Sequence, residues 1–298
     1  MKSLSKPLII ALALSSVSAL ACEKPQVTGY DEVYCLKEDL APVKRNGKYG
    51  FIDKTGKVVV PVQYDDAWSF LEGLAKVKQN DKYGFIDNTG KVVIPVQYDY
   101  AYDFSEGLAK VEQNGKWGLI DKTGKVVIPV QYDGVGSFLE GLATVNQNGK
   151  WGYIDKTGKV VIPFQYDYVG YFSEGLAQVK QNGKWGFIDK TGKVVIPVQY
   201  DETWFFLEGL AQVNQNGKWG YIDKTGKVVI PVQYGHVGYF SEGLAQVKQN
   251  GKWGFIDNTG KVVIPVQYND AGYFENGKAK VQLNGEEFYI DETGKRLD

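Results

Sequence analysis

The stretch Trp151-Gly-Tyr-Ile-Asp-Lys-Thr-Gly-Lys-Val-Val-Ile-Pro163 recurs through the whole chain at a fixed spacing. Its first residue has counterparts one period of 34 residues away on either side, at Trp117 and Trp185. The same step leads to further copies that begin at Tyr49, Tyr83, Trp219, Trp253 and a degenerate Glu287. A constant period of this length indicates a tandem-repeat protein, in which each copy is one structural module.

Eight repeats follow one another without a change of phase. Each begins with a tyrosine, and consecutive tyrosines are 34 residues apart from Tyr30 to Tyr268. We number them repeat 1 to repeat 8, with the bounds 30–63, 64–97, 98–131, 132–165, 166–199, 200–233, 234–267 and 268–298. Residues 22–29 form a short N-terminal arm before repeat 1.

Each repeat carries the pattern of three short strands. In repeat 5 these are 176–180, 185–189 and 193–196, and Pro197 ends the last because proline donates no hydrogen bond to a ladder. Asn182-Gly183 is typical of a hairpin turn, and Gly192 of a second turn. A loop of about ten residues opens the repeat, as in the loops that join short strands of all-β folds. The sequence therefore predicts an all-β protein built from eight three-stranded antiparallel meanders.

The atypical end repeats favour an open array over a closed ring. Repeat 1 has Leu36-Lys37-Glu38-Asp39 where others have Phe-Ser-Glu-Gly, and repeat 8 has Glu286-Glu287-Phe288 in place of Lys-Trp-Gly. Charged terminal repeats are typical of solenoids, whose end faces meet water. We expect an open, superhelical, β-solenoid-like array, with an eight-bladed β-propeller as the alternative.

Residues 1–21 have the features of a secretory signal peptide: Lys2 and Lys6, an apolar run from Leu8 to Leu14, and Ala19-Leu20-Ala21 as a cleavage site. The sequence thus predicts an exported protein, periplasmic or secreted. No later run reaches the roughly 18 apolar residues of a membrane span, so we expect no transmembrane segment. Lys and Arg (34) balance Asp and Glu (35), which disfavours nucleic acid as a partner.

The two cysteines, Cys22 and Cys35, both lie at the start of the exported chain. In an oxidising compartment we expect them to form a disulfide between the arm and repeat 1. The alternative is a lipoprotein anchored through Cys22, because Ser18-Ala19-Leu20-Ala21-Cys22 resembles a permissive lipobox.

The repeated segments Lys-Trp-Gly-Tyr-Ile-Asp, Thr-Gly-Lys-Val-Val-Ile-Pro, Gln-Tyr-Asp and Phe-Ser-Glu-Gly-Leu-Ala resemble the WG-repeat (KWG-repeat) family of bacterial proteins. The resemblance covers residues 30–298, with tyrosine for tryptophan at Tyr49 and Tyr83. It implies envelope or secreted proteins with binding or interaction roles, and it supplies no catalytic motif.

No residue pattern predicts an enzyme, a metal or a cofactor. His236, the only histidine, occupies a position that varies freely among the repeats. The acidic turns Asp-x-Thr-Gly-Lys offer one carboxylate each, whereas calcium takes about six to eight oxygens. We therefore interpret the aspartates as turn residues. We interpret the glutamates of the Phe-x-Glu-Gly loops as residues that cap their loops or form ion pairs, rather than as a row that faces a ligand. We interpret the repeated tryptophans as packing residues, rather than as a ladder on which sugars stack.

The repeats agree closely except at two adjacent positions of the opening loop, and there many of them carry aromatic residues. Variation on a uniform scaffold is where binding specificity can reside. The candidate binding residues are Trp68, Tyr102, Tyr171, Trp204, Phe205, Tyr239 and Tyr273. We expect a non-catalytic exported scaffold that binds a protein or glycan partner, with a purely structural spacer and an envelope enzyme as alternatives.

Overall fold

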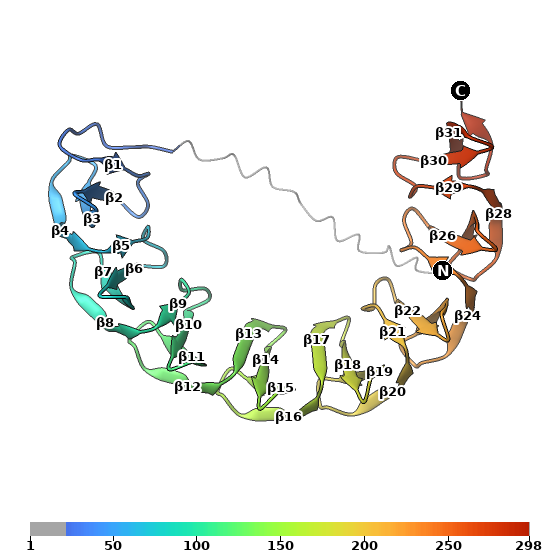
Figure 1. The fold of residues 1–298 in the computed structure, drawn as a ribbon, viewed down its shortest axis with the longest axis horizontal. Helices are drawn as coiled ribbons and strands as arrows, with labels where there is room; N and C mark the ends of the chain where they lie inside the picture. The colour runs from blue at the N-terminus through green and yellow to red at the C-terminus, as the bar shows by residue number, and fades with distance from the viewer. Residues whose placement is uncertain (1–21, 298) are drawn as a thin grey trace, which may run out of the picture. The chain divides into compact units, whose positions relative to one another are not determined.

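The computed structural model describes residues 22–297, and every regular element in that range is a β-strand (Figure 1). The strands form eight four-stranded sheets, each open and ordered as in the sequence, so that neighbouring strands are antiparallel. The all-β tandem-repeat fold predicted from the sequence is confirmed. The predicted signal peptide, residues 1–21, lies outside the described residues.

The first strands of the sheets are mostly short: β1 (Glu32–Val33), β5 (Asp66–Ala67), β9 (Tyr100–Ala101), β13 (Gly134–Leu139), β17 (Tyr168–Ser173), β21 (Glu202–Thr203), β25 (His236–Val237) and β29 (Asp270–Ala271). The second strands are β2 (Leu40–Arg45), β6 (Leu74–Gln79), β10 (Leu108–Gln113), β14 (Leu142–Gln147), β18 (Leu176–Gln181), β22 (Leu210–Gln215), β26 (Leu244–Gln249) and β30 (Lys278–Leu283).

The third strands carry the aromatic-glycine pair: β3 (Lys48–Asp53), β7 (Lys82–Asp87), β11 (Lys116–Asp121), β15 (Lys150–Asp155), β19 (Lys184–Asp189), β23 (Lys218–Asp223), β27 (Lys252–Asp257) and β31 (Glu286–Asp291). The fourth strands are β4 (Val58–Tyr64), β8 (Val92–Tyr98), β12 (Val126–Tyr132), β16 (Val160–Tyr166), β20 (Val194–Tyr200), β24 (Val228–Tyr234), β28 (Val262–Tyr268) and β32 (Arg296–Leu297).

Each sheet has four strands, and not the three predicted from the sequence. The sequence predicts an irregular loop before the second strand, but this loop contains a strand of two to six residues that pairs with the second strand. A two-residue strand is too short to show a period in the sequence, and its pairing is set by the long hairpin beside it. Four antiparallel strands in sequence order are also the unit of a propeller blade, so the alternative architecture shares this module.

The second and third strands form a two-residue hairpin, as predicted. In repeat 5, Gln181 faces Lys184, and Asn182 and Gly183 between them both have positive φ, at 52° and 79°. Positive φ at both positions defines the turn type that matches the twist of antiparallel strands, and Asn-Gly is the pair that adopts it most readily.

The glycine after each tryptophan is required by the fourth strand. A Cβ on Gly186 would stand 2.6 Å from the carbonyl oxygen of Ile196 and 2.8 Å from Pro197 C. The strands approach this closely because β20 bulges: Trp185 and Phe187 pair with Tyr200 and Ile196, so β20 has two more residues than β19 between the paired positions. A bulge leaves residues unpaired, which suits a proline.

By their contacts the strands divide into two compact units, and each is described by itself. Unit 1 comprises residues 22–114 and 119–125, and unit 2 comprises residues 115–118 and 126–297. Repeats 4 to 8 lie in unit 2, where the site described below is found.

Within unit 2 the core is shared between neighbouring repeats. One buried cluster combines Tyr153 and Ile162 of repeat 4 with Ala177, Val179 and Ile188 of repeat 5. The turn residue Gly192 of repeat 5 also packs on Ile162: a Cβ on Gly192 would lie 3.3 Å from Cγ1 of Ile162. A single repeat cannot complete such a core, which explains why the chain needs an array. Val194, the first residue of β20, lies outside this core and is exposed.

Candidate functional site

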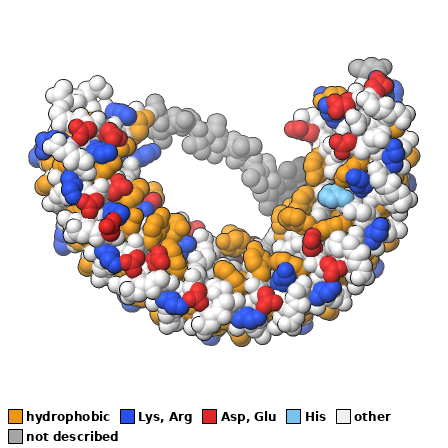
Figure 2. Space-filling model, viewed as in Figure 1, with side chains coloured by type: hydrophobic (Ala, Val, Ile, Leu, Met, Phe, Trp, Pro, Cys, Tyr) orange, Lys and Arg blue, Asp and Glu red, His pale blue; other side chains and the backbone are white. Residues whose placement is uncertain are grey.

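In repeat 5 the varied loop aromatic, Tyr171, stands outside the core because the first strand bulges beneath it. In β17, Val169 and Phe172 pair with Val179 and Ala177, so β17 has one more residue than β18 in this interval. The extra length turns Tyr171 outward, as bulges do, while Val169 and Phe172 stay buried. Figure 2 shows hydrophobic side chains gathered at the surface over β13 and β17.

Four of the candidate residues lie close together across repeats 6 to 8. The ring of Tyr239 is 6.2 Å from Trp204 and stacks on Phe205 at 6.0 Å, measured between ring centroids. Cε1 of Tyr273 is 3.2 Å from the place where a Cβ on Gly238 would stand. Tyr171, Trp204, Phe205 and Tyr273 are each 43–55% exposed, whereas Tyr239 is half-buried. Exposed rings of this number mark a surface able to bind.

The two candidates in unit 1 have a different environment, because a lysine lies over each ring. Lys76 Nζ is 4.4 Å from the centroid of half-buried Trp68, and Lys110 Nζ is 4.2 Å from that of exposed Tyr102. Lys76 also pairs with Asp103 at 3.2 Å. Burial lowers the pKa of Lys110. Cation–π contacts of this kind hold the rings in place.

The acidic turns are turn structures, as the sequence indicates. Asp189 Oδ1 accepts hydrogen bonds from the hydroxyl of Thr191 at 2.6 Å and from the backbone N–H groups of Thr191 and Lys193 at 2.9 and 3.1 Å. The Thr191 hydroxyl, followed by these N–H groups, holds the pKa of Asp189 below its ordinary value. The same bonds recur in the turns that begin at Asp53, Asp87, Asp121, Asp155, Asp223, Asp257 and Asp291.

The loop glutamates join neighbouring repeats. Glu174 of repeat 5 accepts a hydrogen bond from the Gly209 N–H of repeat 6 at 3.1 Å and pairs with Lys224, also of repeat 6, at 2.8 Å. Lys224 and the neighbouring backbone N–H groups hold the pKa of Glu174 below its ordinary value despite partial burial. Glu72 makes the same contacts in unit 1, with Gly107 and Lys122. Each of these glutamates thus caps the corresponding loop of the following repeat.

The repeated tryptophans are half-buried and pack against the core rather than forming an exposed ladder. Trp253 also contacts the ring of His236 edge-on, 5.3 Å between centroids. Burial, together with the charge of Lys248, lowers the pKa of His236. Among residues 22–297 no three His, Cys, Asp or Glu side chains are grouped so as to hold a metal ion.

One set of connecting residues is missing from the sequence interpretation. Asp201, which follows the tyrosine at the end of β20, accepts a hydrogen bond from the Asn216 N–H at 2.6 Å and forms an ion pair with Lys184. It therefore fixes the Asn-Gly turn of its own repeat to the third strand of the previous one. The partners are 15 and 17 residues away, and no sequence period pairs residues at those separations.

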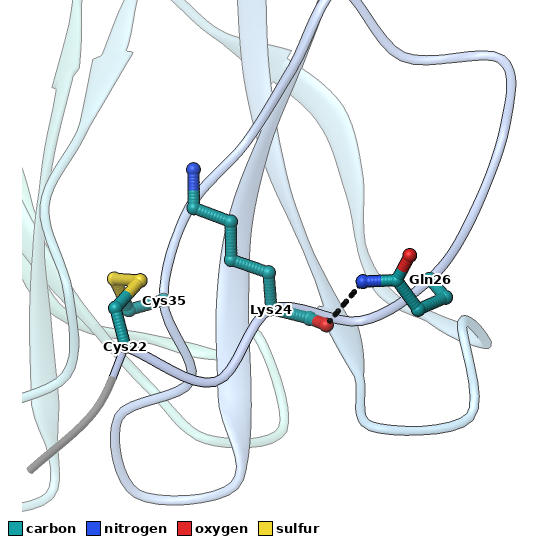
Figure 3. Close-up of a disulfide and its surroundings, with 4 residues drawn as sticks. All are labelled: Cys22, Lys24, Gln26 and Cys35. Carbon is teal, nitrogen blue, oxygen red and sulfur yellow. Dashed lines mark hydrogen bonds between the residues drawn. A yellow bond between two sulfur atoms is a disulfide. The ribbon is translucent and has the colours of Figure 1, made fainter.

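The two cysteines are joined, Cys22 to Cys35, as Figure 3 shows. The arm between them turns at Lys24, whose carbonyl accepts a hydrogen bond from Gln26 at 3.3 Å. A sulfur in this bond cannot also carry a lipid, so the disulfide and the anchor through Cys22 exclude each other. In the described part of the chain, no helix has the length and apolar character to cross a membrane.

The repeated aromatic-glycine pair, with its backbone-contacting glycine, is the mark of a known family. The sequence matches the WG-containing repeat in eight tandem segments: 29–49, 49–83, 83–117, 117–151, 151–185, 185–219, 219–253 and 253–286. The chain belongs to the WG-containing repeat family. Most of these segments run from the aromatic residue of one third strand to that of the next. They are therefore offset from the sheets, each of which begins at its first strand.

Comparison with curated proteins finds no match. Among solved structures, a eukaryotic initiation factor aligns at 12% identity and a TM-score of 0.43, covering 92% of this chain and 89% of that one. PorZ, a surface component of the type-IX secretion system of Porphyromonas gingivalis, aligns at 8% identity and a TM-score of 0.30, covering 90% of this chain and 46% of PorZ.

The extracellular domain of the hybrid two-component system BT3049 of B. thetaiotaomicron aligns at 10% identity and a TM-score of 0.30. That alignment covers 93% of this chain and 51% of the other. The WG-repeat chain thus spans about half the length of the PorZ and BT3049 structures.

Proposed function

We propose that this WG-repeat protein is an exported, non-catalytic scaffold that binds a protein or glycan partner through its loop aromatics. The observation that carries the proposal is the exposed cluster of Trp204, Phe205, Tyr239 and Tyr273, which the core does not require. Aromatic side chains combine a large contact area with few rotatable bonds, and they often dominate binding energy.

The repetition itself argues against catalysis. An active site needs unlike groups converging at one place. Most of the titratable groups that recur here, the turn aspartates and the loop glutamates such as Glu174, are engaged in hydrogen bonds and ion pairs within the turns or between repeats. The purely structural spacer remains the competing function, and it requires no exposed aromatic cluster.

The test combines Trp204→Ala with Phe205→Ala in one exported protein. Because both rings are nearly half exposed, we expect the far-UV circular dichroism spectrum to stay unchanged and the melting midpoint to shift little. Capture of a partner from envelope fractions should weaken strongly. Phe206→Ala is the matched control, because Phe206 is fully buried and its loss should lower stability by about 3–5 kcal/mol.

A double variant that melts as far below the wild type as Phe206→Ala does would place the cluster in the core and contradict the proposal. A wild-type protein that captures no partner, in any envelope fraction, would favour the spacer.

A further inference from the structure

In repeats 4 to 7 of unit 2, a long polar side chain of the second or third strand reaches across to a backbone carbonyl of the next repeat. In repeat 5 this is Gln178, whose Nε2 donates to the carbonyl of Thr203 at 2.6 Å, and in repeat 7 it is Gln246, which donates to Ala271 at 2.9 Å. In repeats 4 and 6 a tyrosine on the adjacent strand donates to the carbonyl one position further along: the Tyr153 hydroxyl donates to Gly170 and the Tyr221 hydroxyl to Gly238.

The two positions face each other in register, so each of repeats 4 to 7 has a pair of residues beside two successive carbonyls of the next repeat. The pairs are Thr144 with Tyr153, Gln178 with Phe187, Gln212 with Tyr221, and Gln246 with Phe255. Repeats 4, 5 and 7 each have one long polar side chain in the pair, a tyrosine or a glutamine. Repeat 6 has both.

In repeat 6 only the tyrosine of the pair makes its bond. Tyr221 donates to the Gly238 carbonyl, whereas the Gln212 side-chain nitrogen Nε2 is buried with no hydrogen-bond partner among the described residues. The residue is only 5% exposed. Burying an amide donor without a partner is unfavourable, and such groups in a folded protein call for an explanation.

Gln212 lines a small hollow between repeats 6 and 7 that opens to solvent. Its other walls include Phe205, Leu207, Tyr221 and Tyr239, two of which belong to the aromatic cluster. Its free volume is about 10 Å³, room for about one group the size of a water molecule. A hydroxyl group therefore fits beside the Gln212 amide, whereas a whole ring does not.

A second hollow, of about 240 Å³, adjoins the first and shares Leu207 and Glu208 with it. Here the connection between repeats is also interrupted. Glu140 and Glu174 each pair with a lysine of the following repeat, but Asn258 stands at that position in repeat 7. Glu208 consequently forms no ion pair within residues 22–297, and both it and Asn258 line the second hollow.

We propose that the junction of repeats 6 and 7 is a carbohydrate subsite, an inference that rests on the proposed binding function. A sugar has what this junction lacks. Its hydroxyl oxygens accept from Gln212, its hydroxyl protons donate to Glu208, and its C–H face packs on the rings of Phe205 and Tyr239. A neutral hexose supplies all three kinds of contact at once, with several hydroxyl groups spread around one apolar face.

The probe is a panel of neutral oligosaccharides, two to six glucose, mannose or galactose residues long, titrated into the full-length exported protein. Calorimetry gives affinity, and the emission of Trp204, beside the hollow, reports binding there. We expect at least one chain type to bind with a measurable Kd and to change the tryptophan emission.

Two variants use residue pairs that the protein already contains. Gln212→Thr reproduces the pair of repeat 4, and Tyr221→Phe reproduces that of repeats 5 and 7, in which glutamine donates to the neighbouring carbonyl. Both should fold normally, with a melting midpoint equal to or above that of the wild type for Gln212→Thr. Both should bind the oligosaccharide at least about tenfold more weakly, the order expected for one directed hydrogen bond.

Asn258→Lys should also weaken binding, because it supplies Glu208 with the partner present in other repeats. Leu139→Ala is the control, since Leu139 is as exposed as Leu207 and stands at its position in repeat 4, away from both hollows. Its affinity should equal that of the wild type.

Absence of oligosaccharide binding to the wild type would overturn the inference and leave a buried water as the partner of Gln212. Equal affinity of wild type and Gln212→Thr would overturn it as well. In either case, loss of partner capture by the Trp204 and Phe205 double variant would still support the proposed function, with a protein as the partner.

Discussion

At the residue scale, the glycine that follows each tryptophan is fixed by the backbone opposite it. The contact is with carbonyl and proline atoms of the fourth strand, which cannot move aside as the end of a flexible side chain can. The tryptophan-glycine pair therefore marks the bulge in the neighbouring strand, and its recurrence follows from the recurrence of that bulge.

Gly186→Ala tests this contact. A Cβ 2.6 Å from the Ile196 oxygen forces the strands apart, and we expect a loss of about 1–3 kcal/mol, as in other overpacked sites. Urea unfolding followed by circular dichroism measures it. Gly134→Ala is the matched control, because the nearest atoms to its Cβ are 3.8 Å away. Equal stability of the two variants would show that β20 yields to the extra methyl group.

The bond between Cys22 and Cys35 gives a second prediction at this scale. The mature exported chain should have an intact mass about two protons below that of the reduced chain, and reduction should restore them. Mass spectrometry of the exported protein measures both values. A mass several hundred daltons higher would identify a diacylglycerol group and replace the disulfide by the lipoprotein alternative.

At the scale of the strand and turn, the aspartate after each fourth-strand tyrosine connects neighbouring repeats, and repeat 7 lacks it. Gly235 occupies that position, so Lys218 has no aspartate of the kind that Lys184 has in Asp201. An aspartate side chain has room at this position, because a Cβ on Gly235 would be no closer than 3.6 Å to any atom outside the adjacent residues.

Gly235→Asp should raise the melting midpoint by roughly two degrees at neutral pH, the size expected from a small gain in a chain this long. The Lys184 ammonium, followed by the Asn216 N–H, lowers the pKa of Asp201 from 3.8, and the new aspartate should behave alike. Because the folded pKa is the lower one, the gain is present above pH 3.8 and disappears as the pH falls through the folded value.

Gly235→Asn is the control for that experiment. Asn269 already shows that an amide oxygen at this position accepts the turn N–H, from Asn284 at 3.0 Å, without an ion pair. The asparagine variant should gain less, and its gain should not depend on acid pH. A gain from Gly235→Asp that persists at pH 2 would mean that the carboxylate charge contributes nothing.

The sequence predicts these elements unevenly, for physical reasons. The Asn-Gly hairpins and the aspartate turns depend on contacts within about five residues, and the long strands have enough residues to show a period, so the pattern reveals them. The short first strand and the Asp201 bonds depend on pairing at greater separations. The unpartnered donor of Gln212 appears only when the register pairs it with Tyr221, because each residue alone occurs elsewhere in the chain without consequence. The loop aromatics could be found because their variation contrasts with the uniform repeats around them.

At the scale of the whole molecule, stability accumulates through contacts between neighbours. Glu140 of repeat 4 pairs with Lys190 of repeat 5, and Lys224 stands at the same position in repeat 6. A repeat whose neighbour is replaced by the next one therefore meets nearly the same surface. This exchangeability is the expected behaviour of a linear array with nearest-neighbour coupling.

Deletion of residues 166–199 joins Gln165 to Tyr200 and keeps the phase of the repeats. We expect a soluble all-β protein with a somewhat lower melting midpoint, since one set of neighbour contacts is lost. Circular dichroism and size-exclusion chromatography measure the outcome. Deletion of 166–182, half a repeat, is the control and should not fold. An insoluble product from the whole-repeat deletion would favour a ring that needs all of its members.

Because the strands of every sheet are neighbours in the sequence, each sheet can form soon after its own residues become available. Each strand pairs with the one made just before it, so most backbone pairing is completed within a few dozen residues. Low contact order of this kind speeds folding, because little loop-closure entropy is lost before pairing begins. A chain that leaves a membrane channel from its N-terminus would thus complete its sheets one after another during transit, exposing at any moment only the apolar surface of the newest one.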